Sequence, residues 1–144
     1  MARTDKLREQ HAELTRIATE LKGHLDEAKL AADATMARSR MSALLGKLLL
    51  HLDTEDQFLY PDLKKSGDAV TASVVDRFQR EMGGLAKTIS AWGDRWSTPS
   101  SIKANPRHFV VETNAVLTSL SARIQREHKD LYPLLDKAAA AAKA

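Results

Sequence analysis

The chain has 144 residues, 43% of them hydrophobic, a formal net charge of +3 and no cysteine. A chain of this length can bury one core without disulfides, and the missing thiols restrict any metal site to nitrogen and oxygen ligands. Its 22 basic residues are interspersed with 19 acidic ones, which gives no support for nucleic-acid binding. The N-terminus is polar and the apolar run Leu48-Leu49-Leu50 is too short to cross a bilayer, so we expect a cytoplasmic protein without a membrane segment.

Apolar residues recur at spacings of three and four along four stretches, which is typical of helices with one buried face. The stretches cover about 5–30, 34–64, 69–95 and 106–138. Asp68 can cap the third helix, and Asn105-Pro106 offers the fourth an N-cap followed by proline in the first turn. Residues 97–101 are predicted to be a loop, and the alanine-rich tail, 138–144, is expected to fray.

No stretch alternates as a strand does, and the connections between the four stretches are short. The sequence therefore predicts an all-α protein with a single domain over 1–144. Because helices joined by short loops pack antiparallel, we expect an up-down-up-down four-helix bundle.

A motif occurs twice, once with a histidine and once with an arginine at its start. His51 and Glu55 precede Leu59-Tyr60-Pro61, and Arg123 and Glu127 precede Leu131-Tyr132-Pro133. Residues four positions apart share a helix face, so His51 and Glu55 can direct an imidazole and a carboxylate toward one point. This pairing suits a first-row transition metal.

The bundle topology brings further polar residues of the apolar faces to the same end. His11 lies early in the first helix, His51 and Glu55 late in the second, and Glu127 late in the fourth. A buried carboxylate is costly unless it is paired, hydrogen-bonded or bound to a cation. A metal ion explains the convergence of several such groups, although each also has a plainer interpretation as a hydrogen-bonded or salt-bridged core residue.

The stretch from Leu7 to Leu14, with His11 at its centre, and the two motifs ending in Leu-Tyr-Pro resemble the haemerythrin-like, or HHE cation-binding, domains. The resemblance covers nearly the whole chain. It implies an antiparallel four-helix bundle with a non-haem di-iron site that handles dioxygen, nitric oxide, iron or peroxide, or acts as a sensor. The implied ligands include His11, His51, Glu55 and Glu127.

The chain departs from the family pattern at two positions. The third helix reads Glu81-Met82-Gly83-Gly84-Leu85, with no histidine, and Arg123 stands where the fourth helix usually has one. An arginine beside the site opposes cation binding. Glu81 is a possible substitute ligand on the third helix, whereas His128 points about 100° away from Glu127 on a regular helix and is a weaker candidate.

Two functions follow from this pattern. The first is a metal-binding protein with a depleted or carboxylate-rich site formed by His11, His51, Glu55, Glu127 and Glu81, with a gas or redox response as the further expectation. It would hold one or two iron ions, with zinc or manganese as alternatives, and a small diatomic ligand as a further partner. The second is a metal-free bundle that serves as an interaction or regulatory module. Catalysis is not expected; if present, it would be metal-based turnover of peroxide or dioxygen. The oligomeric state is left open.

Overall fold

The structure is a computed structural model that describes residues 5–143, with side chains from Asp5 to Lys137 apart from Ser66. Every regular element in this range is helical, which confirms the predicted all-α class. The longer helices are α1 (Asp5–Lys22), α3 (Thr35–Thr54), α5 (Ala69–Met82), α6 (Leu85–Arg95) and α8 (Pro106–Arg126). Helix α9 (Tyr132–Lys143) is similar in length to α6, and the shorter helices are α2 (Glu27–Ala32), α4 (Tyr60–Ser66) and α7 (Pro99–Ala104). Two π-helical turns, η1 (Glu55–Leu59) and η2 (Glu127–Leu131), join α3 to α4 and α8 to α9.

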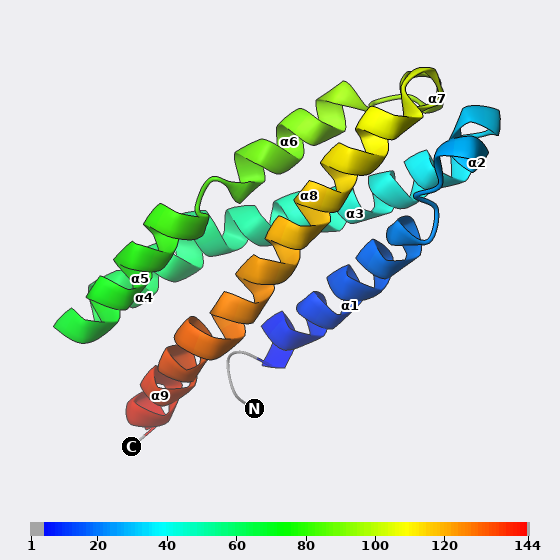
Figure 1. Cartoon of the computed structure of the whole chain (residues 1–144). Coiled ribbons are helices and arrows are strands. Elements are labelled where there is room, and N and C mark those ends of the chain that lie inside the picture. The colour runs from blue at the N-terminus through cyan, green and yellow to red at the C-terminus, as the bar shows by residue number, and fades with distance from the viewer. Residues whose placement is uncertain (1–4, 144) are drawn as a thin grey trace.

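Four of the helices lie lengthwise side by side (Figure 1). Contacts run from α1 to α3, from α3 to α6, from α6 to α8 and from α8 back to α1. The short helices α2 and α7 contact each other at one end, and α4, α5 and α9 extend toward the other (Figure 1). Among the described residues, no helix combines the length and the apolar character that a membrane span needs.

The first predicted helix, 5–30, is divided in two. Helix α1 ends at Lys22, and Asp26 begins α2 by accepting a hydrogen bond of 3.0 Å from the backbone N–H of Lys29. Aspartate is a preferred N-cap residue because its carboxylate satisfies a backbone donor that the first helical turn leaves unpaired. Asp26 therefore sets a boundary that the spacing of apolar residues does not reveal.

Two further predicted boundaries change. Residues 97–101 are not a plain loop, since Thr98 accepts a hydrogen bond from the N–H of Ser101 at 3.2 Å and Pro99 begins α7. The third predicted helix, 69–95, is interrupted between α5 and α6 at Gly83 and Gly84. A Cβ atom at Gly83 would collide with the carbonyl oxygen of Gln79, so this turn requires glycine.

The last helical run continues beyond the predicted end at 138. The backbone of α9 is helical to Lys143. Ala144, the end of the tail that was expected to fray, lies outside the described residues.

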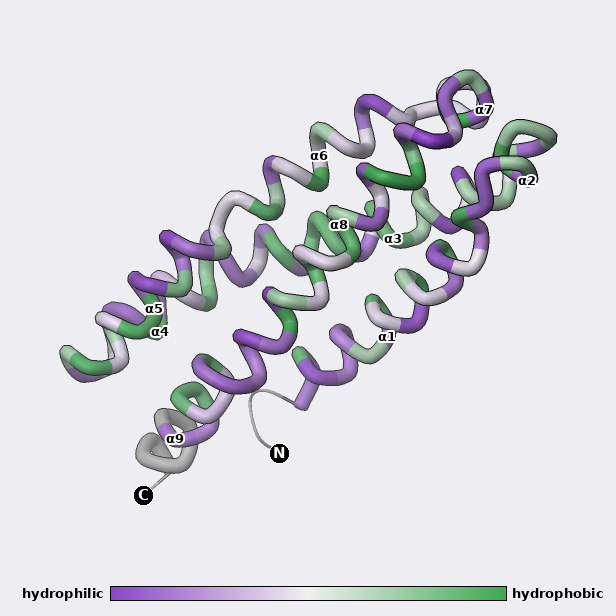
Figure 2. Tube along the Cα trace, viewed as in Figure 1, coloured by the Kyte–Doolittle hydropathy of each residue, from purple (hydrophilic) through white to green (hydrophobic). Residues whose placement is uncertain are grey.

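Hydrophobic and hydrophilic residues alternate turn by turn along α1 and α8, as expected for helices with one buried face (Figure 2). The buried apolar side chains form two clusters. The larger one includes Leu21, Met41, Leu48, Trp92 and Phe109, and the smaller one includes Leu59, Leu63, Val75, Phe78 and Leu135. Along the run from α3 to α4, the buried Glu55 falls between Leu52 of the larger cluster and Leu59 of the smaller one. A polar layer thus separates the two apolar clusters.

Candidate metal centre

Four of the five predicted ligands meet in this polar layer. His11 comes from α1, His51 from α3, and Glu55 and Glu127 begin η1 and η2. All four side chains are buried, and one potential ligand atom from each lies within 4.8 Å of the others. The predicted convergence of these residues is present in the structure; their role as ligands stays a prediction.

The two π-helical turns follow from the prolines that end both copies of the repeated motif. A proline has no N–H to donate, and its ring crowds the carbonyl group four residues earlier. The turns before Pro61 and Pro133 widen accordingly, and the N–H groups of Tyr60 and Tyr132 bond to the carbonyl groups of Glu55 and Glu127, five residues back. Wide turns of this kind are frequent at functional sites.

The spacing of the donor atoms suits one metal ion. His11 Nε2 lies 2.9 Å from His51 Nε2 and 3.7 Å from Glu127 Oε1, and His51 Nε2 lies 3.1 Å from Glu55 Oε1. Imidazole and carboxylate ligands bind an ion such as zinc at about 2.0–2.2 Å, so two of them lie roughly 3.0 Å apart at right angles and roughly 3.4 Å apart in a tetrahedron. These three separations are close to those values, whereas the four ligand atoms together span up to 4.8 Å, somewhat more than the roughly 4.2 Å between ligands on opposite sides of one ion. The residues therefore fit a single ion after a small inward movement of their side chains.

Burial controls the protonation of these groups. Burial, followed by the nearby His51, lowers the pKa of His11 to about 3, and burial also lowers the pKa of His51. Burial and the adjacent Glu55 raise the pKa of Glu127 well above its ordinary value. Both imidazoles are therefore neutral near neutral pH, and the paired carboxylates provide a place that favours a positive charge.

Arg123 supplies one such charge. Its buried guanidinium lies 2.8 Å from Asp56 Oδ1 and 3.4 Å from both Glu55 Oε1 and Glu127 Oε1. Burial alone lowers the pKa of Arg123, but the hydrogen bond with Asp56 and the charge of Glu127 outweigh it and raise this pKa above its ordinary value. The guanidinium thus neutralises carboxylate charge beside the centre, at the position where the family pattern has an imidazole.

Two buried tyrosines also form hydrogen bonds with the carboxylates. One tyrosine occurs in each copy of the repeated motif, and this repetition is the sequence signal that points to them. The hydroxyl of Tyr60 donates to Glu55 Oε2 at 3.1 Å and also reaches Glu127. The hydroxyl of Tyr132 lies 2.9 Å from His11 Nε2 and 3.3 Å from Glu55 Oε2. Burial and then Glu127 raise the pKa of both phenols, so they stay protonated and orient the carboxylates as hydrogen-bond donors.

Two residues beside the histidines were undervalued or missed. Gln10 Oε1 lies 2.7 Å from His51 Nδ1, which no sequence motif indicates. His128, expected to point away, lies with its Nε2 atom 2.9 Å from His11 Nδ1. The expectation for His128 assumed a regular helix, and the wide turn η2 changes the direction of its side chain.

The structure does not bring Glu81 into this group. Its side chain is 46% exposed and pairs with Arg126 at 2.7 Å. Met82, the residue at the missing histidine position, contributes its backbone carbonyl group to Arg123 at 3.3 Å. Helix α5 therefore places no ligand at the centre among the residues that the structure describes.

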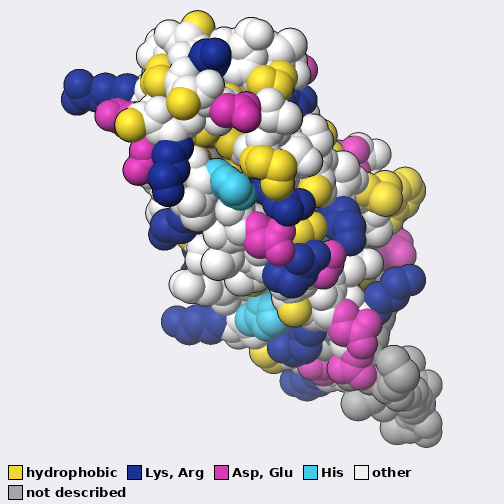
Figure 3. Space-filling view, turned by 90° about the vertical axis from the view of Figure 1, so that its right-hand side faces the viewer, with side chains coloured by type: hydrophobic (Ala, Val, Ile, Leu, Met, Phe, Trp, Pro, Cys, Tyr) yellow, Lys and Arg dark blue, Asp and Glu magenta, His cyan; other side chains and the backbone are white. Residues whose placement is uncertain are grey.

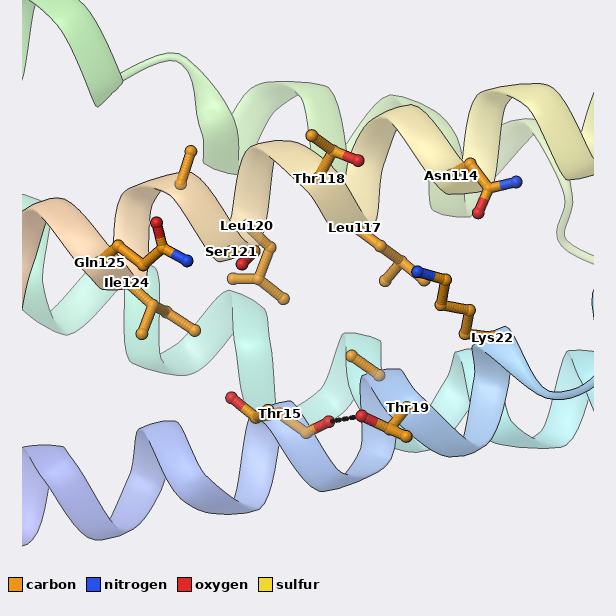
Figure 4. A pocket seen from close by; sticks show the side chains of 12 residues that line it. Thr15, Thr19, Lys22, Asn114, Leu117, Thr118, Leu120, Ser121, Ile124 and Gln125 are labelled. Carbon is orange, nitrogen blue, oxygen red and sulfur yellow. Dashed lines mark hydrogen bonds between the residues drawn. The ribbon is translucent and has the colours of Figure 1, made fainter.

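Two grooves lie on the surface of the described residues. One, of about 730 Å³, is lined by His51 and Gln10 and by several leucines of α1 and α3, so it reaches the edge of the centre. The other, of about 640 Å³, lies between α1 and α8 and is lined by polar side chains such as Thr15, Asn114 and Gln125 but by none of the four converging residues (Figure 4). On the face drawn in Figure 3, basic and acidic side chains are intermixed and no extended area carries one sign of charge.

Comparison with known proteins agrees with this geometry. A family model, the hemerythrin HHE cation binding domain, matches residues 2–135. Searches of the curated proteins and of the solved structures find no match. The matched region spans nearly the whole chain and contains His11, His51, Glu55 and Glu127. The chain therefore belongs to the hemerythrin HHE cation-binding domain family.

Proposed function

We propose that this protein binds one divalent transition-metal ion through His11, His51, Glu55 and Glu127, with iron as the first candidate and zinc or manganese as alternatives. The observation that carries the proposal is the convergence of four buried donor atoms within 4.8 Å. Imidazole and carboxylate donors suit all three metals. When bound, iron would supply redox chemistry and a position for a small diatomic ligand, which is the basis for a gas- or redox-responsive role.

The position of Arg123 supports one ion rather than two. Its guanidinium faces the same carboxylate oxygens of Glu55 and Glu127 that lie close to His51 and His11. Any cation near these oxygens meets the positive charge of Arg123 at short range, where repulsion in a dry interior is strong, and a second cation would add its own repulsion with the first. The missing imidazoles at positions 82 and 123 remove two further ligands.

Arg123 also supports the second candidate, a metal-free bundle that serves as an interaction or regulatory module. The guanidinium already compensates carboxylate charge in the layer, so the fold does not depend on a metal for this purpose. Metal content separates the two candidates directly.

We also propose that the helices form an up-down-up-down four-helix bundle, in which α3 with α4, α5 with α6, and α8 with α9 each act as one long run beside α1. The contacts that connect α1, α3, α6 and α8 in a closed ring support this topology.

The test is metal analysis of protein purified without a metal-affinity resin, followed by titration with Fe²⁺, Zn²⁺ and Mn²⁺. We expect one ion per chain. His51→Ala and Glu55→Gln should each weaken binding by at least about 10-fold to 100-fold, since even residues that only orient ligands have effects of this size. His108→Ala is the matched control, because His108 is 52% exposed and pairs with Glu112 away from the centre. Absence of binding, or equal binding by all variants, would contradict the proposal and favour the metal-free candidate.

A further inference from the structure

Helices α5 and α6 follow each other in the chain but pack on different apolar clusters. Phe78 of α5 belongs to the smaller cluster, whereas Ile89 of α6 belongs to the larger one. Helix α5 lies beside α4, and α6 contacts α3 and α8 (Figure 1). The chain passes from one cluster to the other at Gly83 and Gly84, which we call the glycine junction.

The glycine junction has little support from its surroundings. A Cβ atom added at Gly84 would meet no side chain and no distant backbone atom of the described residues within 4 Å. Glycine also has more backbone freedom than any other residue. The junction can therefore change its conformation more easily than the helices on either side, and the contacts of the last turn of α5 decide how it is held.

Arg123 makes one of these contacts from helix α8. Its Nη1 atom donates to the carbonyl group of Met82, the last residue of α5, at 3.3 Å. Its guanidinium carbon lies 5.5 Å from the centre of the Phe78 ring and 6.0 Å from that of Tyr60. Carbonyl groups at the end of a helix carry partial negative charge, which favours a cation there. Arg123 thus connects the end of α5 with the carboxylates of the centre.

The contacts of this guanidinium with carboxylates are unequal. Arg123 Nη2 lies 2.8 Å from Asp56 Oδ1, a normal hydrogen-bond length, and Nη1 lies 3.4 Å from Asp56 Oδ2. The distances to Glu55 Oε1 and Glu127 Oε1 are both 3.4 Å, which exceeds the usual range. Arg123 Nε, the atom that faces Glu127, forms no hydrogen bond within the described part of the chain. Asp56 therefore holds the guanidinium more closely than the two glutamates do.

Binding of an ion by Glu55 and Glu127 would change this balance. The glutamate oxygens would be engaged by the ion, and its positive charge would repel the guanidinium. Asp56 is not one of the four converging residues, so it stays available to Arg123, as does the Met82 carbonyl group. The contacts of Arg123 with the glutamates would weaken, and those with Asp56 and Met82 would become closer.

We propose that Arg123 is a positioning residue that passes the charge of the centre to the glycine junction. With an ion bound, Arg123 holds the end of α5 more tightly and restricts the junction; without it, the junction is less restricted. This inference rests on the proposed metal binding, and it gives a metal-responsive protein a structural output outside the centre.

The first experiment is hydrogen–deuterium exchange of the unmodified protein with EDTA and with Zn²⁺, after a titration has measured Zn²⁺ binding. Zn²⁺ should slow the exchange of residues 79–86 on the order of threefold to tenfold, the factor expected when one hydrogen bond becomes stronger. Helix α7, a short helix at the opposite end of the molecule, is the internal reference, because local opening also governs exchange in such elements. Its exchange should not change.

Two variants separate the role of Arg123 from general support of α5. Arg123→Met keeps the four converging residues but removes the donor to Met82, so Zn²⁺ should no longer slow exchange at the junction. Arg126→Met is the matched control, because Arg126 pairs with Glu81 of the same helix end at 2.7 Å and with Asp130 at 2.9 Å, rather than with the converging residues. Its junction should exchange faster in EDTA, and Zn²⁺ should still slow this exchange.

Gly84→Ala tests the junction without changing any charge and does not depend on the stability of Arg123→Met. A Cβ atom fits at this position, and alanine has less backbone freedom than glycine. Residues 79–86 should therefore exchange more slowly in EDTA and respond less to Zn²⁺ than in the unmodified protein. An undiminished response of Gly84→Ala would overturn the role of the junction.

The remaining outcomes distinguish this inference from the proposed function. If the protein binds Zn²⁺ but exchange at the junction slows no more than in α7, the inference is wrong and the proposed function stands. Equal slowing in Arg123→Met and in the unmodified protein would refute the role of Arg123 in the same way. If the titration shows no Zn²⁺ binding, the proposed function fails and the inference fails with it.

Discussion

Replacing Arg123 by methionine removes the positive charge of the polar layer while keeping an unbranched, flexible side chain in the core. In the metal-free protein, the carboxylates of Glu55 and Glu127 would lose their compensating cation although both remain buried. Removal of one partner from a buried ion pair typically costs about 3–5 kcal/mol. Asp56, the third partner, is 23% exposed and can regain water, so we expect a loss near the lower end of this range.

A bound metal ion should restore part of the free energy of unfolding that Arg123→Met loses. An ion bound by His51 and the two glutamates would replace the missing charge, and it would no longer be repelled by the guanidinium. We expect Arg123→Met to bind Zn²⁺ at least tenfold more tightly than the unmodified protein, which corresponds to about 1.4 kcal/mol. The stabilisation by a ligand at a concentration 100 times its Kd is about 2.7 kcal/mol, so the effect is measurable.

The assay is urea denaturation followed by circular dichroism, with EDTA and then with added Zn²⁺. Arg16→Met serves as the control, since it removes an exposed arginine and should change the free energy of unfolding only slightly. A loss in Arg123→Met no larger than in this control would show that the guanidinium does not compensate buried charge. Equal stabilisation of variant and unmodified protein by Zn²⁺ would show that it does not oppose the ion.

Three other outcomes are expected. Met82→His combined with Arg123→His restores both missing imidazoles and should raise iron content toward two ions per chain. The loaded variant should show the near-ultraviolet absorption of an oxo-bridged pair, and an unchanged iron content would contradict this prediction. Thr113→Val replaces the buried hydroxyl that accepts the hydrogen bond of the Trp92 N–H at 3.0 Å by a methyl group of similar size, and it should lower the free energy of unfolding by about 1–3 kcal/mol in urea titrations, while no loss would mean that the bond contributes nothing. Burial lowers the pKa of His11 to about 3 from an ordinary 6.5, so the unfolded chain binds a proton that the folded one excludes. Metal-free protein should therefore lose stability as pH falls from 6.5 toward 3, and His11→Gln should reduce this loss; equal pH dependence in both would refute it.

The residues of the candidate metal centre could be identified from the sequence because the chain repeats a motif and places polar residues on apolar helix faces. The spacing of His51 and Glu55, and the correspondence of Glu55 with Glu127, depend only on local helix geometry. The approach of His11 to them depends on the order and length of the helices, which the apolar periodicity also provides.

What sequence reasoning missed depends on irregular backbone or on contacts between distant helices. His128 lies beside His11 because η2, which precedes Pro133, is wider than a regular turn. Glu81 pairs with Arg126 from another helix, a contact that no local pattern specifies. The partnership of Arg123 with Asp56 is of the same kind, since these residues are far apart in the sequence.

The distribution of the aromatic residues gives the protein two separate optical reporters. Both tryptophans of the sequence, Trp92 and Trp96, lie in the larger apolar cluster, whereas both tyrosines, Tyr60 and Tyr132, lie at the polar layer with hydroxyls bonded to its carboxylates. Tryptophan fluorescence therefore follows the integrity of the packed helices, and tyrosine absorption follows events around the carboxylates. A change seen in the second signal but not in the first separates an event at the centre from unfolding of the helices, without any label.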